Sequence, residues 1–232
     1  VTERAVKAVK DRNADCTVAF GGGSSTGLGK AIALRTDLTQ IAIPTTYAGS
    51  EMTPILGETE DGRKTTQRNL KVLPEIVIYD VDFTLTLPPR LTVTSGTNAI
   101  AHAVEALYAQ DRNPVISMMA EQAIVALGRA LPKIVADPKD REARSDALYG
   151  AWLCGLCLGS VGMALHHKLC HVVGGSFNLP HADTHTVILP YATAYNAKAA
   201  PEADRAVARA LGGSDGTQAL VALARKLGSP DS

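Results

Sequence analysis

The sequence has little of what a nucleic-acid-binding or membrane protein needs. Its 23 acidic and 23 basic residues balance, so no net charge would attract nucleic acid or an anionic membrane surface. Aromatic residues make up only 4% of the chain and form no stripe on which bases could stack. No apolar run approaches the ~18 residues needed to span a bilayer, and no charged-then-apolar leader is visible. We therefore expect neither nucleic acid nor a membrane as a partner.

Cysteine is also scarce, with four in the chain. Cys154 and Cys157 form a C-x-x-C, but they lie in the apolar run WLCGLCLGS, which lacks the βαβ setting of a redox motif. We therefore expect them to be small buried side chains. This cysteine usage fits a reducing cytoplasm.

Apolar residues are plentiful, at 46% of 232, which is enough for one large domain or two modest ones with packed cores. Residues 1–14 predict an amphipathic helix with Val6 and Val9 on its apolar side. The chain starts with Val1 rather than Met, inside this helix, so we expect the sequence to be a fragment.

A strand, a glycine-rich turn and a helix follow directly. Residues 16–20 are the apolar, β-branched run typical of a buried parallel strand, and a helix is expected from Leu28. In the turn between them, Gly22 and Gly23 would let the backbone approach an anion, and Ser24 would add a hydroxyl donor. The turn matches neither G-x-G-x-x-G nor the Walker A motif, so a plain tight turn remains the alternative.

Residues 40–44 predict a second buried strand, which leads into the polar loop TTYAGSE. In open α/β sheets ligands bind where strands end, so Thr45, Thr46 and Ser50 are candidates for contact with a cofactor. Turn chemistry is their alternative role. Asp61-Gly62 predicts a hairpin, Lys71 is a further candidate cofactor contact, and residues 75–80 predict a third strand.

The pattern changes at Leu87-Pro88-Pro89-Arg90. We expect residues 1–89 to form an α/β nucleotide-binding domain with a parallel, Rossmann-like sheet, and residues 90–232 to form an all-α domain. The helices expected in the second part cover residues 113–135, 140–157, 159–173, 191–198, 201–211 and 215–227.

Five of the six histidines lie between residues 164 and 190. His167 and His171 are four apart on an expected helix that ends at Gly174-Gly175, so they share a face. His181 begins the next helix, and the three side chains could converge on a metal ion or a substrate. The alternative is a chance gathering of surface or core histidines.

These motifs together resemble the iron-containing alcohol dehydrogenase superfamily. The resemblance rests on GGGS after a strand, IPTT followed by GSE-x-T, the TLP-x-x-L hinge, and a histidine helix followed by H-x-x-x-H and P-H. It covers roughly residues 17 to 190. It implies an α/β nucleotide-binding domain followed by a helical domain, with the active site between them. Both domains would be truncated here, one at its start and the other at its end.

Within the superfamily, TTYAGSEMTPI and VIYDVDFTLTLPPRL resemble the branch that reduces maleylacetate to 3-oxoadipate with NADH or NADPH in the catabolism of aromatic compounds. The resemblance implies a small dicarboxylate substrate and a cytoplasmic homodimer. A metal-dependent alcohol dehydrogenase acting on a small alcohol or aldehyde is the alternative. A catalytically inactive nucleotide-binding protein is a further one.

The superfamily's metal ligands, one aspartate and three histidines, match Asn98, His102, His167 and His181. Asn98 replaces the carboxylate, and loss of this anion weakens the binding of hard iron(II) most. Gly27 stands where the superfamily has an acidic residue, while Lys30 matches its lysine. We therefore expect that no metal is required. We also expect His102, His167, His171 and His181 to surround the substrate as proton donors and as binding groups for an oxyanion or carboxylate.

Overall fold

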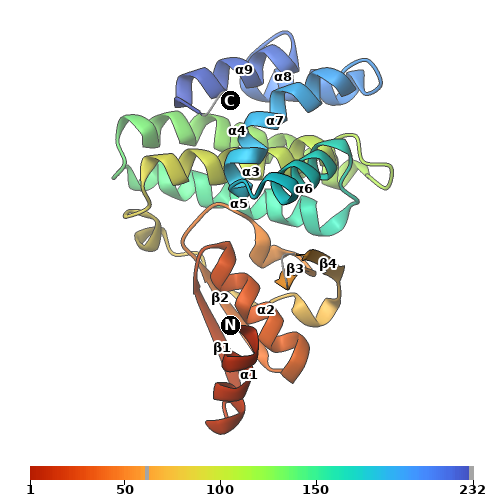
Figure 1. Ribbon diagram of the computed structural model, residues 1–232. Coiled ribbons are helices and arrows are strands. Elements are labelled where there is room, and N and C mark those ends of the chain that lie inside the picture. The colour runs from red at the N-terminus through yellow and green to blue at the C-terminus, as the bar shows by residue number, and fades with distance from the viewer. Residues whose placement is uncertain (61–62, 230–232) are drawn as a thin grey trace.

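All strands of the described chain lie within its first third, and long helices make up the rest (Figure 1). The structure, a computed structural model, describes residues 1–60 and 63–229. Figure 1 shows the strands below the larger set of helices. The helical part begins with α3 (Pro89–Ala106). The division into domains at residues 89 and 90 stays a prediction.

The central sheet is parallel, as predicted. Its strands β1 (Cys16–Gly21), β2 (Thr39–Pro44) and β5 (Ile76–Val77) lie in the order β1-β2-β5. Cys16 pairs with Thr39 and Gly21 with Pro44, so β1 and β2 end together at one edge. Helix α1 (Thr2–Asp11) contacts α2 (Gly23–Thr36), which packs against β1 and β2.

Two details of this part differ from the sequence predictions. Helix α2 begins at Gly23 rather than Leu28, so most of the glycine-rich segment is helix rather than turn. The third strand, expected over residues 75–80, is only Ile76–Val77. Asp61-Gly62 lies outside the described residues, and the flanking strands β3 (Ile55–Glu60) and β4 (Arg63–Arg68) pair antiparallel.

The helical part contains seven helices among the described residues. They are α3, α4 (Pro114–Ala136), α5 (Arg141–Ser160), α6 (Leu165–Phe177), α7 (His181–Asn196), α8 (Pro201–Leu211) and α9 (Gly216–Leu227). The break expected at Gly174-Gly175 does not occur, because α6 continues through both glycines to Phe177. The helix expected over residues 191–198 is the second half of α7, which runs through Pro190.

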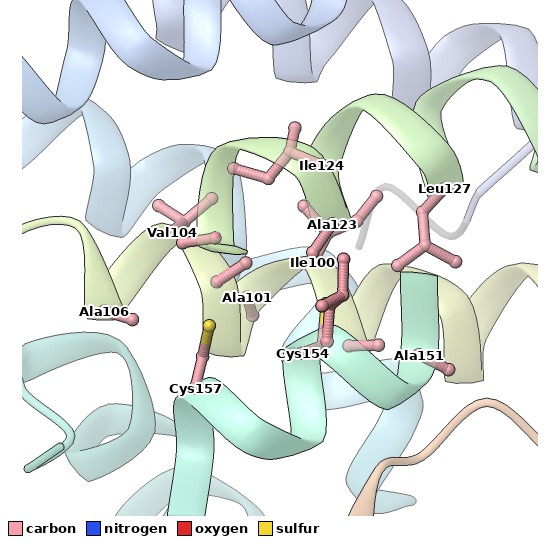
Figure 2. Close-up of a cluster of buried hydrophobic side chains, with 14 of the residues drawn as sticks. Ile100, Ala101, Val104, Ala106, Ala123, Ile124, Leu127, Ala151, Cys154 and Cys157 are labelled. Atoms are coloured by element: carbon pink, nitrogen blue, oxygen red, sulfur yellow. The ribbon is translucent and has the colours of Figure 1, made fainter. Parts of the chain in front are cut away.

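The main core lies between α3, α4 and α5, as Figure 2 shows. Ile100, Ile124 and Leu127 are fully buried there, and Cys154 and Cys157 face them as free thiols. Helix α4 is long and apolar enough by length and composition to cross a membrane. Its contacts with α3 and α5 give those apolar residues a place inside the protein instead.

The loop after β2 rests directly on the helical part. Gly49 has a φ of 76°, and its carbonyl oxygen faces Gly155 of α5, where a Cβ would lie 2.6 Å from it. Nearby, the buried guanidinium of Arg144 donates to the Tyr47 hydroxyl at 3.1 Å and to Thr92 Oγ1 at 2.9 Å. These contacts tie the end of β2 to α3 and α5.

We expect the substitution Gly155→Ala to lower the free energy of unfolding by about 1–3 kcal/mol, because the new methyl group would meet backbone that cannot move freely. Urea unfolding of the full-length variant measures the change. Gly175→Ala is the matched control: nothing lies within 4 Å of its new Cβ, so it should raise stability by about 0.5–1 kcal/mol. Equal effects at both positions would contradict the close approach.

Candidate active site

A cavity of about 790 Å³ lies between the α/β and helical parts, and we call it the cleft. Gly23 and Ser24, at the start of α2, line it together with Ala48 and Ser50 from the loop after β2. The helical part contributes Asn98 and His102 of α3, His167, Lys168 and His171 of α6, and His181 of α7. The cleft therefore has a backbone-rich side at the strand ends and a histidine-rich side opposite.

The structure brings all six histidines into one group, which we call the histidine cluster. His185 lies at its centre and is fully buried. Its ring centroid lies 4.3 Å from that of His181, 4.8 Å from His167, 4.9 Å from His166, 6.3 Å from His102 and 6.5 Å from His171. His102, His167, His171 and His181, expected around one site, do lie together.

The cluster also includes residues that sequence reasoning set aside. His166 and His185 are buried, and His166 Nε2 lies 3.0 Å from His185 Nδ1. Glu105 of α3 is the other addition: its Oε2 lies 2.5 Å from Nδ1 of His167. A carboxylate one turn after His102, inside the apolar run AHAVEALYA, was a usable signal, because an unpaired charge would be costly in such a helix.

Burial keeps much of the cluster uncharged. It lowers the pKa of His166 and of His167 to about 3, and neighbouring histidines add to the effect. The pKa values of His102 and His185 are lowered as well, first by burial and then by the charge that His167 would carry. Protonation of one ring disfavours protonation of the next, so these four imidazoles are neutral near pH 7.

The predicted metal ligands are arranged for hydrogen bonding. Nδ1 of His102 lies 2.8 Å from Nε2 of His167, whereas a tetrahedral ion about 2.0–2.1 Å from each nitrogen would hold them about 3.3–3.4 Å apart. Asn98 turns its amide nitrogen toward Nε2 of His102, at 3.5 Å, and its buried oxygen has no partner among the described residues. A neutral amide and two hydrogen-bonded imidazoles do not fit the iron that the superfamily's name implies.

A second group, His166, His167 and His185, has ring nitrogens within 4.8 Å of one another. The 3.0 Å contact between His166 and His185 is again a hydrogen-bond distance. Each group therefore contains two imidazoles placed to hydrogen-bond to each other.

The predicted cofactor residues divide into two groups. Gly23, Ser24 and Ser50 line the cleft. Gly22, Thr45 and Thr46 are not among its lining residues; Gly22 packs against Thr46, whose methyl group would lie 2.9 Å from a Cβ on Gly22. Lys71 is turned elsewhere: its Nζ pairs with Asp37 at 3.0 Å on the surface.

Lys30 stabilises the loop on the cofactor side of the cleft by hydrogen bonds. Its buried ammonium group donates to the carbonyl oxygens of Ser50, Thr53 and Ile55, and to Thr53 Oγ1, at 2.6–2.9 Å. It therefore fixes the loop that carries Ser50 into the cleft.

Comparison with known proteins agrees with this architecture. Residues 1–81 match the family model of the iron-containing alcohol dehydrogenases, and residues 92–232 match the C-terminal model of the Fe-containing alcohol dehydrogenase family. The chain belongs to the iron-containing alcohol dehydrogenase family. The parallel sheet followed by helices is the fold of its solved members.

Within the family, the chain is similar to maleylacetate reductases. It is 60% identical to the maleylacetate reductase of Rhizobium sp. (strain MTP-10005), over all of this chain and 66% of the relative. It is 62% identical to that of Burkholderia cepacia over 94% of this chain and 62% of the relative. The crystal structure of maleylacetate reductase from Agrobacterium tumefaciens superposes with a TM-score of 0.97 at 58% identity, over 100% of this chain and 66% of that one. The chain thus spans about two thirds of the length of these relatives.

The buried neutral histidines predict a dependence of stability on pH. The pKa of His166 is 6.5 when exposed and about 3 in the fold, so the unfolded chain binds more protons between these values. The free energy of unfolding should therefore fall as the pH drops from 6.5 toward 3, by up to about 1.4 kcal/mol per pH unit for one such histidine.

The variant His166→Gln isolates this effect, because the carboxylates titrate alike in both proteins. Urea unfolding between pH 4 and 7, with a chelator present, should show a shallower loss of stability for the variant. Parallel curves would mean that His166 is not held neutral by the fold.

Proposed function

We propose that the full-length protein reduces maleylacetate to 3-oxoadipate with NADH or NADPH, in the catabolism of aromatic compounds. The observation that carries this proposal is that the N-terminus of α2 and the histidine cluster line the same cleft. The similarity to maleylacetate reductases supports the choice of substrate.

The backbone-rich side of the cleft suits a nicotinamide dinucleotide. Gly23 and Ser24 at the N-terminus of α2 line this side, and the first N–H groups of a helix can bind a phosphate. Ser24 and Ser50 add hydroxyl groups to the same side. When bound, the reduced nicotinamide supplies the hydride.

The histidine side suits reduction of a carbon–carbon double bond conjugated to a ketone. Addition of hydride moves negative charge to the ketone oxygen as an enolate, which hydrogen-bond donors stabilise. A proton must then reach carbon. His102 and His167 are buried and neutral, so we do not assign proton delivery to them. His171 and the exposed His181 also line the cleft, and we propose one of them as the proton donor.

The dicarboxylate needs positive charge, which the neutral imidazoles of the cluster do not supply. Among the described residues that line the cleft, the cationic ones are Lys168 and Arg68, and Glu58 is the acidic one. Lys168 directly follows His167 and is exposed at the cleft, so we propose it as a carboxylate partner. Arg68 donates to the carbonyl oxygen of Gly159 across the cleft.

We infer that the reaction needs no metal, because the histidines and Asn98 are arranged to bond to one another. The alternative function is that of a metal-dependent dehydrogenase for a small alcohol or aldehyde, as the family name suggests. We further propose, from the family resemblance, a cytoplasmic homodimer.

The test of this function is the oxidation of NADH and of NADPH by the full-length protein with maleylacetate, before and after treatment with a strong chelator. We expect turnover with maleylacetate that survives chelation, because the cleft offers hydrogen-bond donors in place of a Lewis acid. The control is the same assay with small aldehydes as substrates.

Two outcomes would contradict the proposal. Turnover confined to small aldehydes, lost with chelator and restored by Zn²⁺ or Fe²⁺, would establish the metal-dependent alternative. Absence of turnover with either substrate class would leave a protein that only binds the nucleotide.

Asn98 offers a second prediction. The substitution Asn98→Asp supplies a carboxylate beside His102, so we expect Zn²⁺ to bind at least about tenfold more tightly, or about 1.4 kcal/mol. Calorimetric titration of the chelator-treated protein measures the affinity.

The control is Asn113→Asp, the same chemical change at the start of α4, where Asn113 caps the helix by accepting from the N–H of Ile116. Aspartate caps helices equally well, so the fold should be unaffected. We expect this variant to bind no extra metal. If Asn98→Asp gains no affinity, Asn98 does not occupy the ligand position.

A further inference from the structure

Arg68 reaches from the α/β part of the protein to the helical part. It is the last residue of β4, and its Nη2 donates to the carbonyl oxygen of Gly159 in the last turn of α5. The last carbonyl oxygens of a helix lack partners within the helix, and a cation beside them is favoured. The Arg68 guanidinium is therefore held at the end of α5, at the edge of the cleft that it lines.

The segments on either side of this hydrogen bond are fixed by other contacts. Arg68 pairs with Ile55 in the ladder between β3 and β4, and the buried ammonium group of Lys30 donates to the carbonyl oxygen of Ile55 at 2.9 Å. The end of α5 packs against the segment before β3, since a Cβ on Gly159 would lie 2.8 Å from the carbonyl oxygen of Met52. These contacts join the two segments without the Arg68 side chain.

The guanidinium keeps donors for a ligand. Arginine carries five N–H donors in a planar fork that matches a carboxylate, and the hydrogen bond to Gly159 uses one nitrogen, Nη2. Among the residues that the structure describes, neither Arg68 nor Lys168 forms an ion pair with a carboxylate. Glu58, the acidic residue of the cleft lining, pairs with Arg35 at 3.1 Å. The two positive charges of the cleft therefore have no counter-ion in this part of the chain.

Lys168 stands on the helical side of the same corner. It lies in the first turn of α6, directly after a histidine of the cluster, and is exposed at the cleft. Residues 161–163, which connect α5 to α6, also line the cleft. Asp111 holds this connection by accepting from the N–H of Gly162 at 3.0 and 3.1 Å. Arg68 and Lys168 thus flank the connection between α5 and α6, one from each part of the protein.

We propose that Arg68 is a specificity-determining residue, which together with Lys168 binds the two carboxylates of a small dicarboxylate. This deepens the proposed function, on which its kinetic part rests, and explains why the substrate must carry two carboxylates. Neither contact is a reaction step, so both act on the affinity for the substrate. A monocarboxylate leaves one cation without a partner and loses the charge-assisted hydrogen bonds at that end.

The direct test measures the binding of adipate and of hexanoate to the full-length protein by calorimetry, with NADH present. Adipate has two carboxylates, and hexanoate has one on a chain of the same length. We expect the wild-type protein to bind adipate at least about tenfold more tightly, because the second carboxylate engages the second cation. Arg68→Gln should remove most of this preference and leave the affinity for hexanoate within about threefold, because Lys168 still binds one carboxylate.

Arg112→Gln is the matched control. Arg112 is also exposed and also donates to a backbone carbonyl oxygen, that of Ala109 at 3.2 Å, but it is not among the residues that line the cleft. This variant should keep the full preference for adipate. If Arg68→Gln lowered the affinity for both ligands by the same factor, Arg68 would support the shape of the cleft rather than bind a carboxylate, and the proposal would be wrong. An unchanged preference for adipate would overturn it as well.

Kinetics separate this proposal from the proposed function. We expect Arg68→Gln to raise KM for maleylacetate about tenfold or more while KM for NADH and for NADPH is unchanged, because the lost contact is with the substrate. A raised KM for either nucleotide with an unchanged KM for maleylacetate would assign Arg68 to the cofactor and overturn the proposal. A wild-type protein that prefers adipate through Arg68 but does not reduce maleylacetate would support the pair of cations and reject the proposed function.

Discussion

The buried ammonium group of Lys30 holds the loop after β2 in place. This loop lines the cleft with Ser50 and rests on the helical part. Four oxygen atoms of residues 50–55 surround the ammonium group, so the backbone there has little freedom to move. Burial lowers the pKa of Lys30 to about 8, and the nearby Glu51 opposes the shift. Because the loop then lies against α5 through Gly49 and Gly155, this charge helps to set the position of the strand ends relative to the helical part, together with the Arg144 hydrogen bonds to Tyr47 and Thr92.

Charge placement also explains the composition of the histidine side. Six histidines can share a small volume only if most of them are neutral, since each added proton raises the cost of the next. Glu105 is the anion in contact with this group, and it is fully committed to His167 and to backbone N–H groups. The cluster is thus organised by hydrogen bonds between neutral rings, which require directed donors and acceptors.

The sequence predicted the local elements well, because they depend on periodicity and on glycine and proline placement. The strand at Cys16, the second strand and most helices lie where they were expected. Gly174 and Gly175 misled the prediction, because packing of α6 against α7 outweighs the modest helix penalty of glycine. The third strand is shorter than expected because its pairing with β2 covers only Ile76 and Val77 and ends where the N–H of Ile78 donates to the carbonyl oxygen of Ala42.

The site was predictable only in part. The spacing of His167, His171 and His181 indicated that they converge, because two of them share a face of one helix and the third begins the next helix. The position of Glu105 in an apolar helix was a usable signal, but its partner His167 and the role of His185 could not be assigned, because they depend on contacts between α3, α6 and α7 that no local pattern encodes. Lys71 was expected to contact the cofactor, but it is not among the residues that line the cleft. It lies in η2 (Leu70–Val72) and pairs with Asp37 at the end of α2.

The two thiols in the core have a practical meaning. Burial raises the pKa of Cys157 to about 12 and that of Cys154 well above its ordinary value, so neither forms a reactive thiolate in the folded protein. Alkylating reagents can reach them only when α5 separates from α3 and α4. Cys154 and Cys157 are therefore natural reporters of core opening, and their rate of modification measures how often α5 separates from α3 and α4.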